Sequence, residues 1–272
     1  MRIICDINIF YGVSYELLNK ISEIHTLVVT KVAINEILST EGWKNSKYER
    51  VLKTLKKSKH VAQSGSNYFL LQPEDILLTK SGITSLPPKP SEIYTSDKIN
   101  SLLDANDSLH SQAIEMMKNN SGSNDYETLF ADAFKEMIDR IDSIDEIYSE
   151  KLNGTNFHML HPDLKTILIN TVLHYFSLRV NKYITIVHER NPVFYIPQGI
   201  KLRNDEVVVQ TYAAYLYHRI RELPAKNDQF DLQYMFYLNE GDKIWTSDNL
   251  LITLLKNELN RANLLFNPES CI

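Results

Sequence analysis

Four separate segments of the chain each present one carboxylate beside an apolar run: Asp6, Glu36, Asp231 and Asp248. If these side chains converge in the folded protein, their charges repel one another, and such a cluster is stable mainly with a hard cation. Carboxylate oxygens without cysteine or histidine favour Mg²⁺ or Mn²⁺ as that cation. One or two such ions can activate water and stabilise the leaving oxygen of a phosphodiester, so the four acids favour nuclease chemistry.

The placement of these acids gives the interpretation its physical basis. Asp6 ends the apolar run at residues 2–5, which predicts a buried strand, and open α/β sheets bind ligands at the carboxyl ends of their parallel strands. Asp248 likewise follows a strand predicted at 243–246. Glu36 lies within an apolar helix face, where a charge is costly unless it is paired or bound to a metal.

Several polar residues beside these acids have two interpretations each. Asp228 and Asp231 both lie at the start of a predicted helix, where one can cap the helix while the other is left for a metal. Asn8 is either a turn or cap residue or a helper at the site. Thr246 and Ser247 either hydrogen-bond a phosphate or a metal-bound water, or cap the helix that follows.

A basic segment provides candidate phosphate contacts. Lys53, Lys56 and Lys57 lie on one predicted helix and could bind a nucleic-acid backbone, although a solvated helix face has the same pattern. The formal net charge of −5 weakly opposes a wide nucleic-acid surface, but it does not oppose a small acidic catalytic pocket.

Strands and helices must alternate along the chain to bring the acids to one edge of a sheet. Short apolar runs predict strands at 2–5, 27–29, 68–71 and 243–246. Helical spacing predicts helices at 14–24, 30–38, 48–57, from Pro73, and at 206–223, 227–238 and 249–259. This alternation is typical of a parallel α/β sheet.

The pattern changes in the middle of the chain. A proline-rich stretch at 81–91 predicts a linker, and acidic residues outnumber basic ones between residues 97 and 150. Apolar residues at three- and four-residue spacing from Phe130 to Tyr148 predict one long amphipathic helix with an acidic outer face, and Pro162 begins a second.

The ordered acids resemble the motifs of the PIN-domain family of metal-dependent nucleases. The opening ICDINIF, which carries Asp6, resembles the first motif, and VVTKVAINEIL, which carries Glu36, resembles the second. The segment DLQYMFYLNEGDKIWTSD, from Asp231 to Asp248, resembles the third and fourth motifs together. This spacing favours Asp231 over Asp228 as the third ligand.

The resemblance implies a three-layer α/β fold and Mg²⁺- or Mn²⁺-dependent cleavage of RNA, including single-stranded RNA. Such domains occur as toxins of bacterial toxin–antitoxin pairs and in RNA processing. The resemblance covers about residues 1–80 and 205–265, which are further apart than the family usually has them. We therefore expect a PIN-like domain formed by residues 1–81 and 201–272, with 82–200 as an inserted α-helical subdomain.

The remaining expectations concern partners and alternatives. The acidic insertion is expected to bind a protein or to regulate access, unless its helices simply pack on one another. A catalytically inactive PIN-like binding module and a DNA nuclease of related fold remain alternatives. A haloacid dehalogenase-type phosphatase is disfavoured because Asn8 stands where that family needs a second aspartate. No apolar run approaches the ~20 residues that span a bilayer, and no signal-peptide pattern is present, so we expect a cytoplasmic protein without a membrane partner.

Overall fold

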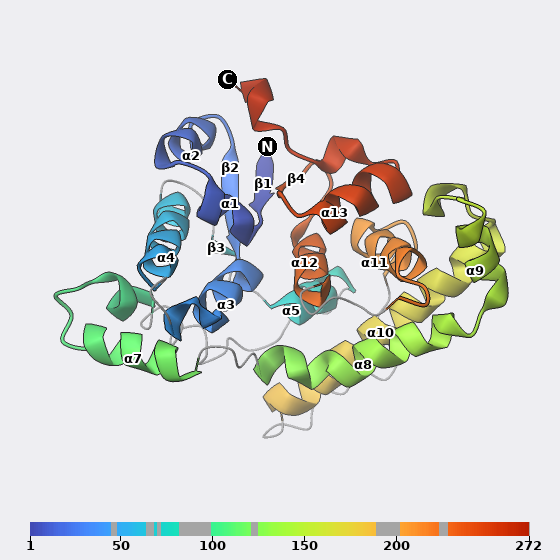
Figure 1. Ribbon diagram of the computed structural model, residues 1–272, viewed down its shortest axis with the longest axis horizontal. Helices are drawn as coiled ribbons and strands as arrows, with labels where there is room; N and C mark the ends of the chain where they lie inside the picture. Colours follow the sequence, from blue (N-terminus) through green and yellow to red (C-terminus); the bar gives the residue numbers. More distant parts are fainter. Residues whose placement is uncertain are drawn as a thin grey trace.

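The computed structural model describes residues 1–44, 48–63, 68–69, 72–81, 99–120, 125–188, 202–222 and 228–271. It shows a mostly helical α/β protein with a small parallel sheet, in which the strand order is β3-β2-β1-β4 (Figure 1). The strands are β1 (Arg2–Cys5), β2 (Thr26–Thr30), β3 (Tyr68–Phe69) and β4 (Lys243–Trp245). The predicted α/β class with a parallel sheet is therefore confirmed, and helices make up most of the rest.

The central strand β1 is buried on both faces. Ile4 lies opposite Val28 of β2 and Ile244 of β4, and all three side chains are fully buried. Ile3 and Cys5, which point to the other face, are equally buried. A parallel strand covered on both sides is apolar at every position, which is why the run at residues 2–5 predicted it.

One face of the sheet packs against helices from the first part of the chain, and one helix from the middle of the chain joins the same hydrophobic cluster. Because side chains alternate along a strand, Ile3, Cys5 and Val29 share this face and join one hydrophobic cluster. The surrounding helices are α1 (Ile7–Gly12), α2 (Tyr15–Ser22), α3 (Lys31–Ser39), the 3₁₀ turn η1 (Glu41–Lys44), α4 (Tyr48–Gln63) and α7 (His110–Asn120).

The opposite face of the sheet belongs to a second hydrophobic cluster. Ile4, Val28 and Ile244 are part of this cluster, which extends to residues of α8, α10 and α11. The helices and turns on this side are α5 (Pro73–Lys80), α8 (Asp125–Asp142), α9 (Asp145–Leu152), η2 (Phe157–Met159), α10 (Pro162–His188), α11 (Val207–His218), α12 (Asp228–Gln233), η3 (Tyr234–Tyr237), α13 (Asn249–Thr253) and the π-helical turn η4 (Leu254–Glu258). Two 3₁₀ turns, η5 (Ala262–Leu264) and η6 (Pro268–Cys271), end the chain.

Buried polar bonds attach α10 to the helix that follows β3. Arg179 of α10 and Glu74 of α5 are both fully buried and form an ion pair. One helical turn further along α10, the Tyr183 hydroxyl donates to Oδ1 of Asp75 at 2.8 Å. These bonds tie the middle of the chain to the sheet domain.

The middle of the chain differs from the sequence-based expectation in several details. The long helix expected from Phe130 to Tyr148 is two helices, because α8 ends at Asp142 and α9 begins at Asp145. The helices of the expected insertion also divide between the two clusters: α7 joins the first, whereas α8 and α10 join the second. The expected linker at 81–91 lies outside the described residues apart from Ser81. The division of the chain into domains stays a prediction.

The closing helices are shorter than their apolar patterns suggested. Helix α11 ends at His218, and the chain then adopts a left-handed conformation at Arg221, with φ of 58°. Few L-residues adopt that conformation within a helix. The helix expected at 227–238 changes to a 3₁₀ turn at Tyr234, and the helix expected at 249–259 changes to a π-helical turn at Leu254. No described helix is both long enough and apolar enough to cross a bilayer.

Candidate active site at the strand ends

The carboxyl ends of β1, β2 and β4 lie at one edge of the sheet because the three strands are parallel. The backbone N–H of Asp6 donates to the carbonyl of Trp245 at 3.0 Å, which extends the pairing of β1 and β4 by one residue. A helix begins shortly after each of these two strands: Asp6 is the N-cap of α1, and Asp248 is the N-cap of α13. Strand pairing thus places two of the predicted acids together.

Asp6 is fully buried and held by its neighbours. The Thr246 hydroxyl donates to Oδ2 of Asp6 at 2.6 Å, and Nδ2 of Asn8 donates to the same oxygen at 3.1 Å. The Asn8 backbone N–H donates to Oδ1 at 3.3 Å. Burial raises the pKa of Asp6, these hydrogen bonds oppose the increase, and the charge of Asp248 adds to it. Thr246 and Asn8 therefore both contact Asp6, and their roles at a metal or phosphate site stay predictions.

Asp231 reaches the same edge from α12. Burial raises the pKa of its half-buried carboxyl to about 8, and the charges of Asp248, Asp6 and Asp228 add to the increase. Within the described part of the chain, no lysine or arginine forms an ion pair with Asp6, Asp231 or Asp248. We call these three residues the acid cluster.

Glu36 lies at the border of the acid cluster and is linked to it through a tyrosine. The Tyr234 hydroxyl donates to Oε2 of Glu36 at 2.6 Å and accepts from the backbone N–H of Ile7, next to Asp6, at 3.2 Å. Burial raises the pKa of Tyr234, and the charges of Glu36 and Asp6 raise it further. One phenol therefore lies within electrostatic reach of two predicted site acids.

Sequence reasoning missed Tyr234 among the aromatic residues of its segment. Its position three residues after Asp231 places it on the same face of the helical turn. A buried tyrosine hydroxyl usually finds a hydrogen-bond partner, so the tyrosine at this spacing was the available signal.

Asp228 has a different environment from Asp231, although the sequence left both as candidate ligands. Its buried carboxylate accepts a hydrogen bond from the Tyr215 hydroxyl at 3.1 Å and pairs with Nε of Arg219 at 3.2 Å. A carboxylate with its own cation has little need of a metal. The geometry therefore favours Asp231 over Asp228 as a metal ligand.

The acid cluster is not gathered around a single point. Among the residues that the structure describes, no three histidine, cysteine, aspartate or glutamate side chains are arranged to hold a metal ion. Oδ1 of Asp248 instead accepts from the Leu251 N–H at 2.8 Å, and Thr246 engages Asp6. The donor chemistry nevertheless suits a hard cation, because oxygen-only ligands are those that Mg²⁺ and Mn²⁺ prefer. Ser247, which the sequence also suggested, is exposed.

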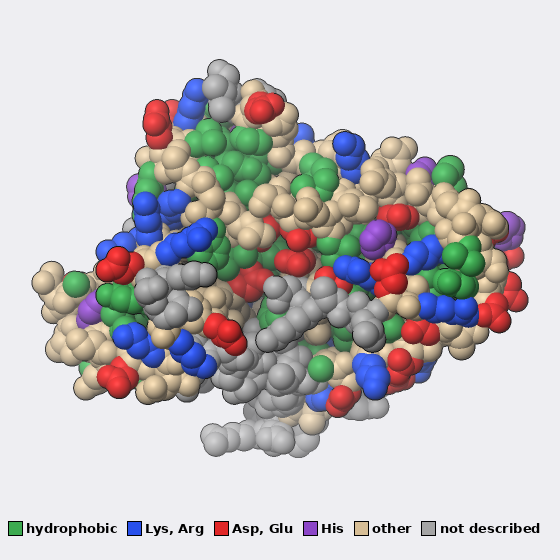
Figure 2. All heavy atoms as spheres, in the orientation of Figure 1, with side chains coloured by type: hydrophobic (Ala, Val, Ile, Leu, Met, Phe, Trp, Pro, Cys, Tyr) green, Lys and Arg blue, Asp and Glu red, His purple; other side chains and the backbone are tan. Residues whose placement is uncertain are grey.

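The predicted basic helix has one buried member. Lys53 and Lys56 are exposed on α4, whereas Lys57 is buried and its Nζ donates to the carbonyl of Val13. Lys57 therefore does not belong to an exposed phosphate-binding face with the other two. Figure 2 shows Lys and Arg side chains over α4 and acidic side chains near the centre of the same face, in the region of α3 and α12.

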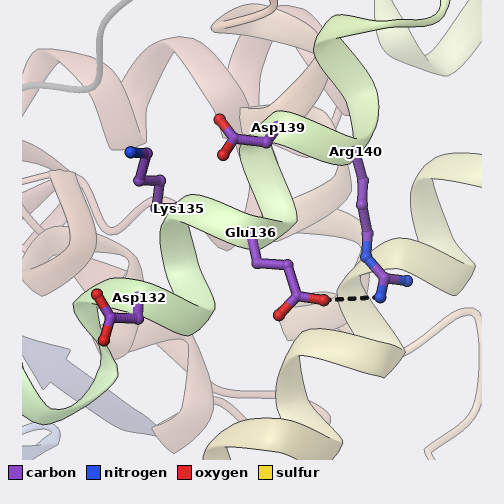
Figure 3. Close-up of a pocket in the computed structure, with 5 residues that line it drawn as sticks. All are labelled: Asp132, Lys135, Glu136, Asp139 and Arg140. Carbon is purple, nitrogen blue, oxygen red and sulfur yellow. Dashed lines mark hydrogen bonds and ion pairs between the residues drawn. The ribbon is translucent and has the colours of Figure 1, made fainter.

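A shallow hollow on α8 lies apart from the acid cluster and contains none of its residues. Its volume is about 460 Å³, and it is lined by Asp132, Lys135, Glu136, Asp139 and Arg140 of α8. These residues come from successive turns of one helix, and Glu136 pairs with Arg140 at 2.7 Å (Figure 3). Such an exposed pair is typical of a solvated helix face. Binding of a protein to this acidic surface stays a prediction.

Comparisons with protein families, with curated proteins and with solved structures found no match to this chain. The resemblance to PIN domains therefore depends on the ordered acids alone. The functional argument depends on the geometry of the acid cluster.

Proposed function

We propose that the chain is a metal-dependent nuclease that cleaves RNA with a site built on Asp6, Asp231, Asp248 and Glu36. One observation carries the proposal: three carboxylates from distant segments lie within electrostatic reach of one another at the carboxyl edge of a parallel sheet, and no described ion pair neutralises them. Buried like charges destabilise a fold. A binding partner with positive charge is the simplest reason to keep them.

The chain's own residues supply orientation. Thr246 and Asn8 hold Asp6 in place, and Tyr234 holds Glu36. A bound Mg²⁺ or Mn²⁺ would supply Lewis-acid activation of water and stabilisation of the leaving oxygen. Asp6, Asp231 and Asp248 would hold the ion.

A PIN-like architecture is the matching proposal for the fold. The two hydrophobic clusters, one on each face of the sheet, support the three layers that the resemblance implies. In this proposal the helices α7 to α10 are an insertion between the second and third motifs.

The test combines cleavage with metal binding. We expect the purified protein to cleave single-stranded RNA with Mn²⁺ and not with EDTA, and Asp6→Asn or Asp231→Asn to abolish cleavage. Asp139→Asn, an exposed acid on α8, is the matched control and should leave cleavage intact. Mn²⁺ at 100 times its Kd should also stabilise the wild type by about 2.7 kcal/mol, and Asp231→Asn should lose most of that gain.

The outcomes separate the alternatives. If the protein cleaves single-stranded DNA in preference to RNA, the proposed substrate is wrong and the proposed metal site is retained. If the protein neither cleaves RNA nor gains stability with Mn²⁺, the proposal is overturned in favour of an inactive binding module.

A further inference from the structure

A cavity lies directly beside the acid cluster and is not used by the chemistry proposed above. Its volume is about 330 Å³, near the lower end of the roughly 300–1,000 Å³ typical of small-ligand sites. It is formed where α1, the turn after α3 and α4 meet. The lining residues are Asn8, Tyr11, Thr40, Gly42, Arg50 and Val51.

Two lining residues connect the cavity to the acids. Asn8 donates a hydrogen bond from its side chain to Asp6 at 3.1 Å. Tyr11 lies within electrostatic reach of Glu36, whose charge adds to the effect of burial in raising the pKa of the tyrosine. A molecule in the cavity would therefore lie against the proposed catalytic edge.

The cavity presents one cation and one aromatic ring together. The Arg50 guanidinium carbon lies 5.4 Å from the centroid of the Tyr11 ring, within cation–π distance. Arg50 is exposed, and no described carboxylate forms an ion pair with it. Thr40, another lining residue, lies close enough to the Tyr11 hydroxyl to lower the pKa of that tyrosine, against the increase that burial causes.

The wall of the cavity is closely packed at a glycine. A Cβ atom added at Gly42 would lie 2.8 Å from Cγ2 of Val51, closer than side-chain carbons approach one another. A larger residue would therefore push the turn away from α4, which also carries Arg50. The cavity shape depends on this close approach.

We propose that this cavity binds one nucleotide of a single-stranded RNA next to the scissile phosphate, with its phosphate on Arg50 and its base against Tyr11. This inference depends on the proposed nuclease function, because it treats the acids as the cleavage point. An arginine and an aromatic ring are what single-stranded nucleic acids need for phosphate contact and base stacking. A base inside a duplex is already stacked and could not reach the ring, so the site selects single strands.

The test measures RNA binding without metal and cleavage with it. Binding of a fluorescent single-stranded hexaribonucleotide is followed by anisotropy in EDTA at several salt concentrations. Tyr11→Leu should weaken binding at least about 5-fold, the lower limit for loss of one stacked base, and Tyr11→Phe should recover most of it. Arg50→Ala should lower the slope of log affinity against log salt by about 0.7, the value for one phosphate contact in a single strand.

Two controls keep the result specific. Arg140→Ala removes an exposed arginine on α8 and should change neither binding nor cleavage. A duplex of the same sequence should bind the wild type more weakly than the single strand and should not respond to Tyr11→Leu.

The outcomes distinguish this inference from the proposed function. If the wild type cleaves RNA with Mn²⁺ but the Tyr11 and Arg50 variants keep its KM and affinity, the nucleotide-subsite proposal is wrong and the nuclease proposal is supported. If the wild type does not cleave RNA but binds single strands through these two residues, the subsite proposal is supported and the nuclease proposal is wrong. Equal binding of duplex and single strand would overturn the subsite.

Discussion

Two regions of the molecule bury charged side chains in opposite ways. Glu74 and Arg179 are fully buried and form an ion pair. Arg179 also donates to the Tyr175 hydroxyl at 3.0 Å and lies 4.4 Å from the Phe130 ring centroid. The acid cluster instead buries like charges, which neutral donors such as Thr246 only partly compensate. The first arrangement neutralises its own charges, whereas no described ion pair neutralises the second.

The comparison suggests how to separate structural from functional charges. A buried ion pair is costly to form, yet removing one partner is worse, so the pair between α5 and α10 is maintained by the fold. The mutual repulsion of carboxylates that raise the pKa of one another destabilises the fold, and groups with perturbed pKa concentrate at functional sites. We infer that the acid cluster is retained for its ligand.

The largest expected effect on the free energy of unfolding comes from breaking the buried ion pair of Glu74 and Arg179. Glu74→Gln leaves the Arg179 charge buried without its anion, so the free energy of unfolding should fall by about 3–5 kcal/mol. Urea unfolding measures it. Glu136→Gln, which breaks the exposed pair with Arg140, is the control and should cost less than about 1 kcal/mol.

A rescue variant keeps this prediction testable if Glu74→Gln barely folds. Combining it with Arg179→Met removes both charges and should recover a large part of the loss, because a buried pair can often be replaced by apolar groups. Equal losses in Glu74→Gln and Glu136→Gln would mean that burial does not distinguish the two pairs.

Much of the site edge could be predicted from sequence, because local patterns determine it. The apolar run before Asp6 and the strand before Asp248 specify parallel strands, and parallel strands bring their ends together. Asp231 could be placed only by its spacing, with Asp228 as a competitor.

The partners of these groups could not be predicted, because they depend on tertiary contacts. Arg179 lies 105 residues from Glu74, and Tyr234 lies 198 residues from Glu36. The pattern around Pro73 indicated only a helix start, so nothing local marked Glu74 as fully buried. The cavity beside Tyr11 likewise forms where three separate segments meet.

An intermediate effect should follow from removing the neutral donor inside the acid cluster. Thr246→Val keeps the shape but deletes the hydroxyl that donates to Asp6 and accepts from the Asp248 N–H at 2.9 Å. Losing a hydrogen bond to a charged group should lower the free energy of unfolding at pH 7 by about 1.5–3 kcal/mol. Thr246→Ser retains the hydroxyl and should lose much less in the same urea titration. A loss of the same size in both variants would show that packing of the methyl group, not the hydrogen bond, is responsible.

The smallest effect on the free energy of unfolding is expected from Asp231→Asn in the absence of metal. Unlike the variants above, this one should gain stability. The pKa of Asp231 is raised to about 8 from an ordinary 3.8, so the folded protein holds a proton there that the unfolded chain releases. Stability should therefore fall as pH rises from about 4 to about 8, and the wild type should be least stable above that range. Asp231→Asn removes the titrating group and should flatten this part of the curve.

Asp231→Asn should be more stable than the wild type at pH 8, and the gain should be smaller than the full pKa shift would give, because water partly screens the half-buried carboxylate. Thermal melting in EDTA between pH 4 and pH 9 measures the effect, and Asp139→Asn supplies the curve of a variant that lacks an exposed acid. Saturating Mn²⁺ should reverse the order at pH 8, because the ion stabilises the wild type and the variant has lost a ligand. An Asp231→Asn curve parallel to that of the wild type would show that Asp231 does not feel the other acids, and the contrast with Glu74 and Arg179 would then lose its basis.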